Sequence, residues 1–358
     1  MVVTLTQTLF AELALRGAAS ALLIYMGVRF LRSRGDSTLS RLGGTFAFGT
    51  AAYSILSVSV NDVIEPPLLS VLELIGTLNS VFFWWFATAL FDDEFRWNTT
   101  RLLPAAVMLV IYTLRTSGSI WVQTEYDELV QQCLIALMMG HALILALLNY
   151  QSDLIEPRRR FRLAFATFVG ITGLLITLVE FVYWGQDAVP PSLSLLHAFS
   201  MFALSFGFCY FLMDGEQDVF DVQPTMPSKA SELPEFPDQL AQRLDEVMRE
   251  GAFRGEGLTI AMLAETIGMP EYRLRRLINQ QLGHKNFNSY LNGYRIAEAE
   301  RILSDSAQIR RQVTLIAFDL GYGSVSTFNR AFKQATGFTP SAYRKAALAG
   351  LVPVGSGP

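Results

Sequence analysis

Cysteine is nearly absent from this chain of 358 residues, which contains only Cys133 and Cys209. Both lie inside apolar runs, so we expect buried thiols rather than a disulfide or a metal site. Charge is also scarce, because 17% of the residues are charged where a soluble domain usually has about 25%. With 51% hydrophobic residues, part of the chain is expected not to face water.

Lysine is absent from residues 1–213, which contain 12 Arg and 15 acidic residues. Residues 214–256 have 4 basic and 11 acidic residues, a net charge of −7, whereas residues 257–346 have 12 basic and 6 acidic residues, a net of +6. The basic C-terminal module predicts a polyanionic partner. Residues 1–9 have no basic residue, so we expect the first apolar run to be a retained membrane span rather than a signal peptide.

Seven apolar runs in residues 1–213 approach the about 20 residues that a membrane-spanning helix needs. They are Leu9–Leu31, Leu42–Val60, Leu68–Phe91, Leu102–Trp121, Leu129–Tyr150, Leu163–Trp184 and Leu193–Met213. The run that contains Arg115 is the weakest of the seven. The alternative is a helix-rich soluble domain with a large core, which the charges of the connecting loops disfavour.

The arginines of these loops are unevenly distributed. With the N-terminus outside, the outside loops contain only Arg115, against ten arginines in the inside loops, a strong positive-inside bias. The ten are Arg29, Arg32, Arg34, Arg41, Arg96, Arg101, Arg158, Arg159, Arg160 and Arg162. Seven spans then place residue 214 onward in the cytoplasm, which predicts a multi-pass protein of the bacterial inner membrane.

Ionisable residues inside the predicted spans are candidates for intramembrane sensing, because such groups are costly in hydrocarbon. The candidates are Glu73, His141, Glu180 and His197. If they converge on one cavity, the spans sense a ligand; if each faces a separate neighbour, the spans only anchor the chain. Glu12 and Arg16 are four residues apart and are expected to pair on one helix face.

Residues 214–237 have the composition of an extended linker, with four prolines, many acids and no helical periodicity. We favour a spacer. The alternative is autoinhibition, in which these acids compete with DNA phosphates for a set of basic residues. That set is Arg275, Arg276, Arg310 and Arg311. Residues 238–249 are expected to form a helix, and residues 347–358 a flexible tail.

Residues 258–283 have the pattern of a helix-turn-helix unit. Ile260, Leu263, Ala264 and Ile267 are expected to pack inward, Gly268 to allow the turn and Pro270 to start the second helix. The core stripe of the second helix is Leu274, Leu277, Ile278 and Leu282. Its opposite face contains Tyr272, Arg275, Arg276 and Asn279, and such an arginine-rich face suits reading of the DNA major groove.

Residues 313–337 repeat this pattern. Leu315, Ile316 and Leu320 are expected to pack inward before the turn, and Ser324 to cap the next helix. The buried stripe of that helix is Phe328, Ala331, Phe332 and Ala335, which leaves Ser326, Thr327 and Arg330 outside. Thr339 and Pro340 have the order typical of the start of a last helix.

Residues 240–346 resemble the DNA-binding domain of the AraC/XylS family, through "NFNSYLNGYRIAEAERIL" and "IAFDLGYGSVSTFNRAFKQATGFTPSAYR". The resemblance implies two helix-turn-helix units joined by a long helix, with one recognition helix in each of two adjacent major grooves. The expected linker helix Phe287–Ser304 is ~27 Å long, close to the ~34 Å between successive grooves on one DNA face. The predicted fold class is thus all-α, with a seven-helix membrane bundle (1–213) followed by this domain (238–346).

The family's base-reading positions fall on Tyr272, Arg275 and Arg276 in the first unit. In the second unit they fall on Val325, Ser326, Thr327 and Arg330. Val325 departs from the polar residue often found there, and either contacts a thymine methyl group or packs against Phe328.

The predicted function is a membrane-anchored transcription regulator that couples a membrane signal to gene control. The alternative is a membrane enzyme or transporter with a self-regulatory DNA-binding tail, but the spans contain no metal-ligand cluster and no nucleophile paired with a base. We therefore expect no enzymatic activity, no cofactor and no metal site. The predicted partners are double-stranded DNA and the lipid bilayer, with RNA polymerase and a second copy of the chain as further candidates. The effector is not identified, because a membrane domain replaces the sugar-binding domain of soluble family members.

Overall fold

The structure is a computed structural model of the whole chain. It describes residues 7–32, 38–57, 65–92, 95–117, 125–148, 150–155, 159–160, 162, 164, 190–214 and 238–351. The predicted span Leu163–Trp184, with Glu180, lies outside these residues except for the backbone of residue 164. The linker 215–237 and the tail 352–358 lie outside them entirely.

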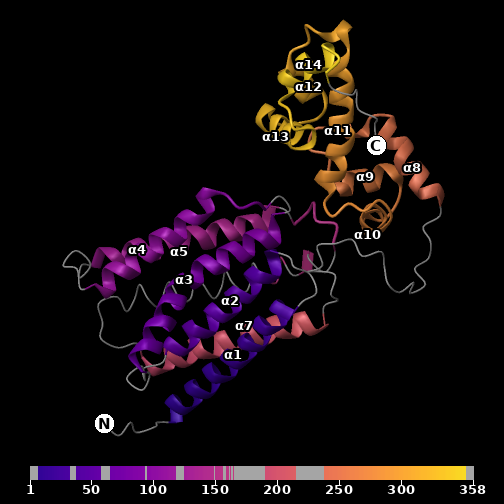
Figure 1. Ribbon diagram of the computed structural model, residues 1–358. Helices are drawn as coiled ribbons and strands as arrows, with labels where there is room; N and C mark the ends of the chain where they lie inside the picture. Colours follow the sequence, from indigo (N-terminus) through magenta and orange to yellow (C-terminus); the bar gives the residue numbers. More distant parts are fainter. Residues whose placement is uncertain are drawn as a thin grey trace. The chain divides into compact units, whose positions relative to one another are not determined.

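The described residues form helices and no strand beyond one isolated bridge, which confirms the all-α fold class. The chain divides into two compact units, one of Met1–Tyr150 with Arg160–Thr225 and one of Gln151–Arg159 with Met226–Pro358. The short segment 151–159 thus belongs with the C-terminal unit, which the predicted domain boundaries did not anticipate. Each unit is coloured along the sequence in Figure 1.

The N-terminal unit is a bundle of long helices (Figure 1). They are α1 (Gln7–Arg32), α2 (Thr38–Leu56), α3 (Pro66–Phe91), α4 (Thr99–Thr116), α5 (Glu125–Leu148) and α7 (Pro191–Asp214). Helix α1 packs on α2 and α7, and α3 packs on α2, α4 and α5. Small residues permit the close approach of α1 and α2, because a Cβ atom added at Gly44 would lie 3.4 Å from the Gly27 carbonyl oxygen.

Four helices among the described residues are long and apolar enough to cross a membrane. They are α1, α3, the Leu129–Leu148 part of α5 and the Pro191–Tyr210 part of α7. The prediction of seven spans is therefore wrong for α2 and α4. Helix α2 is rich in Gly, Ser and Thr, and α4 is only 18 residues long with two arginines. The small and hydroxyl-bearing residues lower the mean hydropathy of α2, and the two arginines lower that of α4.

The C-terminal unit has one hydrophobic core to which all of its described helices except η6 contribute. The helices of this unit are α8 (Asp238–Arg249), η4 (Ala252–Arg254), α9 (Ile260–Ile267), α10 (Glu271–Arg276), η5 (Leu277–Gln281), α11 (Phe287–Ser304), η6 (Ser306–Gln308), α12 (Val313–Asp319), α13 (Val325–Thr336) and α14 (Pro340–Leu348). Helix α11 has the bounds predicted from the sequence. It contacts η4 on one side and α13 and α14 on the other, and so joins the two halves of the domain (Figure 1).

Several side chains expected to be buried are exposed. Leu282, Leu315 and Ala335 are exposed, because each lies at the edge of a predicted apolar stripe and not at its centre. Ala317 is buried on α12 beside Ile316. Cys133 is exposed on α5, whereas Cys209 is buried as predicted.

Candidate nucleic-acid interface

The first helix-turn-helix unit consists of α9, a tight turn, α10 and η5. Thr259 caps α9, because its hydroxyl accepts a hydrogen bond from the Met262 amide. Gly268 ends α9 with φ +78°, a left-handed conformation that favours glycine, and α10 follows after Pro270. The predicted core residues of α9 are all buried. Local sequence signals therefore place the second helix of this unit as expected.

The second unit consists of α12, a turn and α13. Gly321 has φ +80°, and a Cβ atom there would lie only 2.6 Å from the Arg254 carbonyl oxygen. Ser324 caps α13 by accepting a hydrogen bond from the Thr327 amide, as predicted. Thr339 likewise caps α14, which begins at Pro340. Phe328 and Phe332 anchor α13 in the core.

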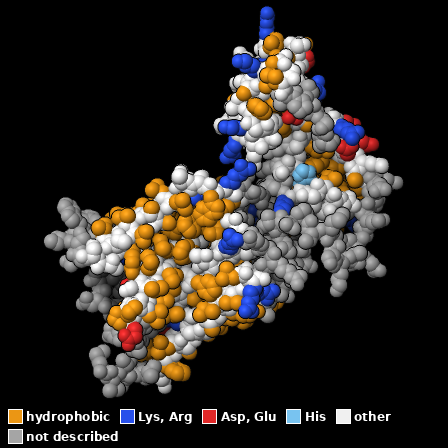
Figure 2. Space-filling model, viewed as in Figure 1, with side chains coloured by type: hydrophobic (Ala, Val, Ile, Leu, Met, Phe, Trp, Pro, Cys, Tyr) orange, Lys and Arg blue, Asp and Glu red, His pale blue; other side chains and the backbone are white. Residues whose placement is uncertain are grey.

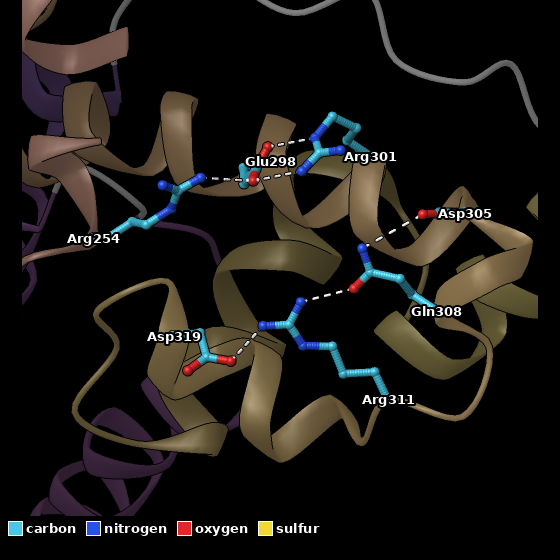
Figure 3. Close-up of polar contacts among 7 residues, drawn as sticks. All are labelled: Arg254, Glu298, Arg301, Asp305, Gln308, Arg311 and Asp319. Carbon is cyan, nitrogen blue, oxygen red and sulfur yellow. Dashed lines mark hydrogen bonds and ion pairs between the residues drawn. The ribbon is translucent and has the colours of Figure 1, made fainter. Parts of the chain in front are cut away.

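Ion pairs form on α11 and at the end of α12, the helix that precedes α13 (Figure 3). Glu298 on α11 forms ion pairs with Arg254 at 2.8 Å and Arg301 at 2.7 Å. These arginines, with the hydrogen bond from Arg301 as the largest cause, hold the pKa of Glu298 below its ordinary value. Arg311 pairs with Asp319 at 2.6 Å. Arg311 therefore has an acidic partner within the domain, whereas the autoinhibition hypothesis pairs it with acidic residues of the linker.

Exposed polar side chains lie at the start of α13. Ser326, Thr327 and Arg330 are all exposed, and Arg330 forms no ion pair with any residue of the described ranges. The hydroxyls of Ser326 and Thr327 lie 3.1 Å and 2.9 Å from the Ser324 hydroxyl. Val325 is partly buried and packs against the domain core, which favours packing over a thymine contact.

The predicted DNA-contacting side chains of the first unit differ in their exposure to solvent. Tyr272 is exposed on α10, and Arg276 is partly exposed. Asn279 donates a hydrogen bond of 2.9 Å from its amide nitrogen to the His284 carbonyl, so it holds the turn after η5. Arg275 is only 5% exposed, although the sequence predicts it on the solvent face.

Arg275 is buried because residues 151–155 lie against it. Its guanidinium donates to the backbone carbonyls of Asp153 at 2.6 Å and Gln151 at 2.9 Å, and its Nε donates to Glu271 at 2.8 Å. No pattern in residues 151–155 predicted these contacts. The one sequence feature that related this segment to the DNA-binding domain is its predicted cytoplasmic position, directly after the predicted span Leu129–Tyr150.

The intramembrane candidates do not gather at one place. His141 on α5 accepts a hydrogen bond of 3.1 Å from the Trp84 indole, whereas Glu73 is exposed on α3. His197 on α7 instead lies beside Arg16, with 3.5 Å between the Arg16 Nη2 and the His197 Nδ1 atoms. Each of the three described candidates thus has different neighbours.

A polar cluster does form around Arg16, which the sequence predicted only to pair with Glu12. That pair is present at 2.9 Å, and the Ser194 hydroxyl donates to the same Glu12 oxygen at 2.6 Å. Arg16 is 3% exposed, yet its Nη1 has no hydrogen-bond partner among the residues that the structure describes. The same holds for Nε2 of His197. No group of three His, Cys, Asp or Glu side chains within the described ranges could hold a metal ion.

Comparison with known proteins identifies the C-terminal domain. Residues 263–346 match a family described as a helix-turn-helix domain, and this match supports a DNA-binding domain of the AraC type. Searches of curated proteins and of solved structures returned no match. The matched residues run from α9 through α14 and include both helix-turn-helix units. The chain therefore contains an AraC-type DNA-binding domain, as found in transcription regulators.

Proposed function

We propose that this DNA-binding transcription regulator is anchored in the bacterial inner membrane by its N-terminal unit and couples a signal there to gene control. The observation that carries the proposal is the presence, in one chain, of four membrane-length apolar helices and a two-unit helix-turn-helix domain. The N-terminus lies outside and the C-terminal domain in the cytoplasm. Without α2 and α4, the run at 163–184 still gives an odd number of spans, and eight of the eleven loop arginines then fall on the cytoplasmic side, which supports this topology.

The surface of the N-terminal unit supports the membrane assignment. Large apolar side chains point outward along its helices, and Figure 2 shows them spread over one face of the unit. They include Leu103, Val110, Leu137, Ile144, Phe199 and Phe206. Only 17–39% of each membrane-length window is buried inside the protein. A soluble protein rarely exposes an apolar surface of this extent.

Double-stranded DNA contacts are proposed for the exposed side chains of the two recognition helices. Arg330 and Arg276 are the candidates for guanine, because a guanidinium can donate two hydrogen bonds to that base. Tyr272, Ser326 and Thr327 flank them. Arg275 joins this set only when its present backbone partners release it.

Signal coupling is supported by the cluster of Glu12, Arg16, Ser194 and His197. A buried guanidinium nitrogen without a hydrogen-bond partner costs free energy, and such a group is typical of a functional site. The three predicted residues that the structure describes, Glu73, His141 and His197, have separate neighbours, which taken alone favours anchoring. We therefore assign sensing to the Arg16 cluster. Replacement of Arg16 by Gln is expected to alter transcription from target promoters without removing the protein from the membrane.

Two measurements test the proposed function. Reporter fusions at both ends should place the N-terminus outside and the C-terminus in the cytoplasm, and a cytoplasmic N-terminus would contradict the topology. Chromatin mapping should recover discrete binding sites for the full chain, and residues 238–351 expressed alone should share those sites. Uniform binding to the genome would argue against a sequence-specific regulator.

A further inference from the structure

Residues 151–155, which we call the strand after the one bridge that they form, lie against the DNA-binding domain as a turn followed by an irregular stretch. Asp153 makes an antiparallel bridge with Asn286, the residue before α11. The Leu154 amide donates to the Lys285 carbonyl at 3.1 Å, and the Phe287 amide donates to the Ser152 carbonyl at 2.8 Å. Paired backbone hydrogen bonds of this kind are how an extended peptide docks on a domain.

Side-chain burial adds an anchor to this backbone pairing. Leu154 is 3% exposed and belongs to the same core cluster as the helices of the domain. Asp153 is fully buried, and its carboxylate accepts a hydrogen bond of 3.1 Å from the Ile155 amide. The segment therefore fills a formed site rather than lying loosely on the surface.

The docked strand occupies Arg275 of the first recognition helix. Nη1 donates to Asp153, Nη2 to Gln151 and to Glu271, and Nε to Glu271, so each nitrogen of the guanidinium has a protein acceptor. Reading a guanine requires two of the same donors. Arg275 therefore cannot satisfy the strand and a base edge together.

We propose that residues 151–155 are an intramolecular docking strand that competes with DNA for the first recognition helix. The partner that fits this surface is thus an extended segment of the same chain, and the inference rests on the proposed function. The strand follows α5 closely in sequence, since α5 ends at Leu148. A movement of α5 that pulls the strand away would free Arg275 for DNA, which gives the membrane unit a direct route to the recognition helix.

The size of the effect follows from the populations of the docked and released states. If the strand is docked in about nine molecules of ten, the apparent affinity for an operator is reduced about tenfold relative to the released state. The second recognition helix still binds in either state. The strand therefore tunes affinity and base choice at one half of the site.

A reversible crosslink tests the competition directly. Asp153 and Asn286 form a pair flanked by the two backbone hydrogen bonds, for which the Cα atoms lie about 4.5 Å apart, within the range of a disulfide. The variant is Asp153→Cys with Asn286→Cys, in a chain where Cys133→Ser and Cys209→Ala remove the native thiols. The full chain is placed in lipid nanodiscs, and its affinity is measured for a duplex selected from random DNA.

We expect the oxidised form, in which every molecule is docked, to bind this duplex several-fold to about tenfold more weakly than the same sample after reduction, because only the reduced form can release Arg275 to a base. Adding Arg275→Ala should weaken the reduced form and bring the ratio of the two forms close to one. Equal affinities before and after reduction, or tighter binding when oxidised, would overturn the docking proposal alone. Failure of both forms to bind any DNA would overturn the proposed function as well.

A second variant needs no crosslink. Leu154→Asp should expel the strand and raise affinity, whereas Gln151→Ala should leave affinity unchanged, because Gln151 contributes its backbone carbonyl and its side chain is exposed. If Leu154→Asp unfolds the domain, the crosslinked pair still decides the question. A folded Leu154→Asp protein with unchanged affinity contradicts the proposal.

Discussion

The guanidinium carbon of Arg295 lies 5.1 Å from the centre of the Tyr322 ring, which joins α11 to the turn of the second helix-turn-helix unit. The same guanidinium donates to the backbone carbonyls of Phe253 at 2.8 Å and Gly255 at 2.9 Å. Burial lowers the pKa of Arg295 and raises the pKa of Tyr322 to about 12. One buried side chain thus ties the start of the domain to its second recognition helix.

Replacement of Arg295 by Lys should destabilise the domain by about 1–3 kcal/mol, because buried carbonyls lose their partner and the planar stack on Tyr322 is lost. Urea unfolding of residues 238–351 measures the change. Arg301→Lys is the matched control, since Arg301 is largely exposed on the same helix. A loss for Arg295→Lys no larger than for the control would contradict the assigned role.

Replacement of Gly321 by Ala should cost at least about 2 kcal/mol of unfolding free energy. The new Cβ atom would meet the Arg254 carbonyl oxygen at 2.6 Å, and the φ of +80° disfavours any L side chain. Gly323→Ala is the control, because a Cβ atom there has no neighbour within 4 Å. Similar melting temperatures for the two variants would show that the turn relaxes freely.

Replacement of Arg330 by Ala should weaken binding to a preferred DNA site by about 1–3 kcal/mol and relax base choice at one position. Arg249→Ala removes the same charge from an exposed side chain on α8, and should have a smaller effect. Competition with random DNA distinguishes the roles. If Arg330→Ala weakens specific and random binding equally, Arg330 contacts a phosphate instead of a base.

The stability of the C-terminal domain should fall as the pH drops below 6.5, in part through His284. Burial lowers the pKa of His284 from its ordinary value of 6.5, so the folded state binds fewer protons than the unfolded state. Stability is then greatest above 6.5 and is lost as the pH falls toward the folded pKa. Thermal unfolding between pH 7.5 and 5.5 tests this, and His284→Gln should reduce the slope. An unchanged slope would show that other groups carry the pH dependence.

Local patterns in the sequence determined most of the DNA-binding domain. The resemblance to the AraC/XylS family predicted α11 with its observed bounds, and single residues marked the ends of other helices. Gly268 ends α9, and Ser324 and Thr339 cap α13 and α14 as expected. These features depend on neighbours within one helical turn, so they can be read without the tertiary structure.

Apolar runs likewise located the helices of the N-terminal unit, including α2 and α4, although only four of the described helices have the hydropathy of a membrane span. Hydropathy measures how apolar a helix is, but it does not determine which other helices pack against it. The packing of α1 on α2 and α7 decided which polar residues meet. It brought Arg16 to His197, 181 residues later in the chain, and left His141 with Trp84.

For Arg275, the sequence determined its position on the helix, and the tertiary structure determined its burial. Helical periodicity determined that Arg275 lies on the face opposite the core stripe, where a base-reading residue belongs. Only the tertiary structure decided that this face is covered, because the acceptors of its guanidinium come from Gln151 and Asp153, more than 120 residues earlier. Helical periodicity predicts which face of a helix is polar. Whether that face is buried depends on which distant segment of the chain packs against it.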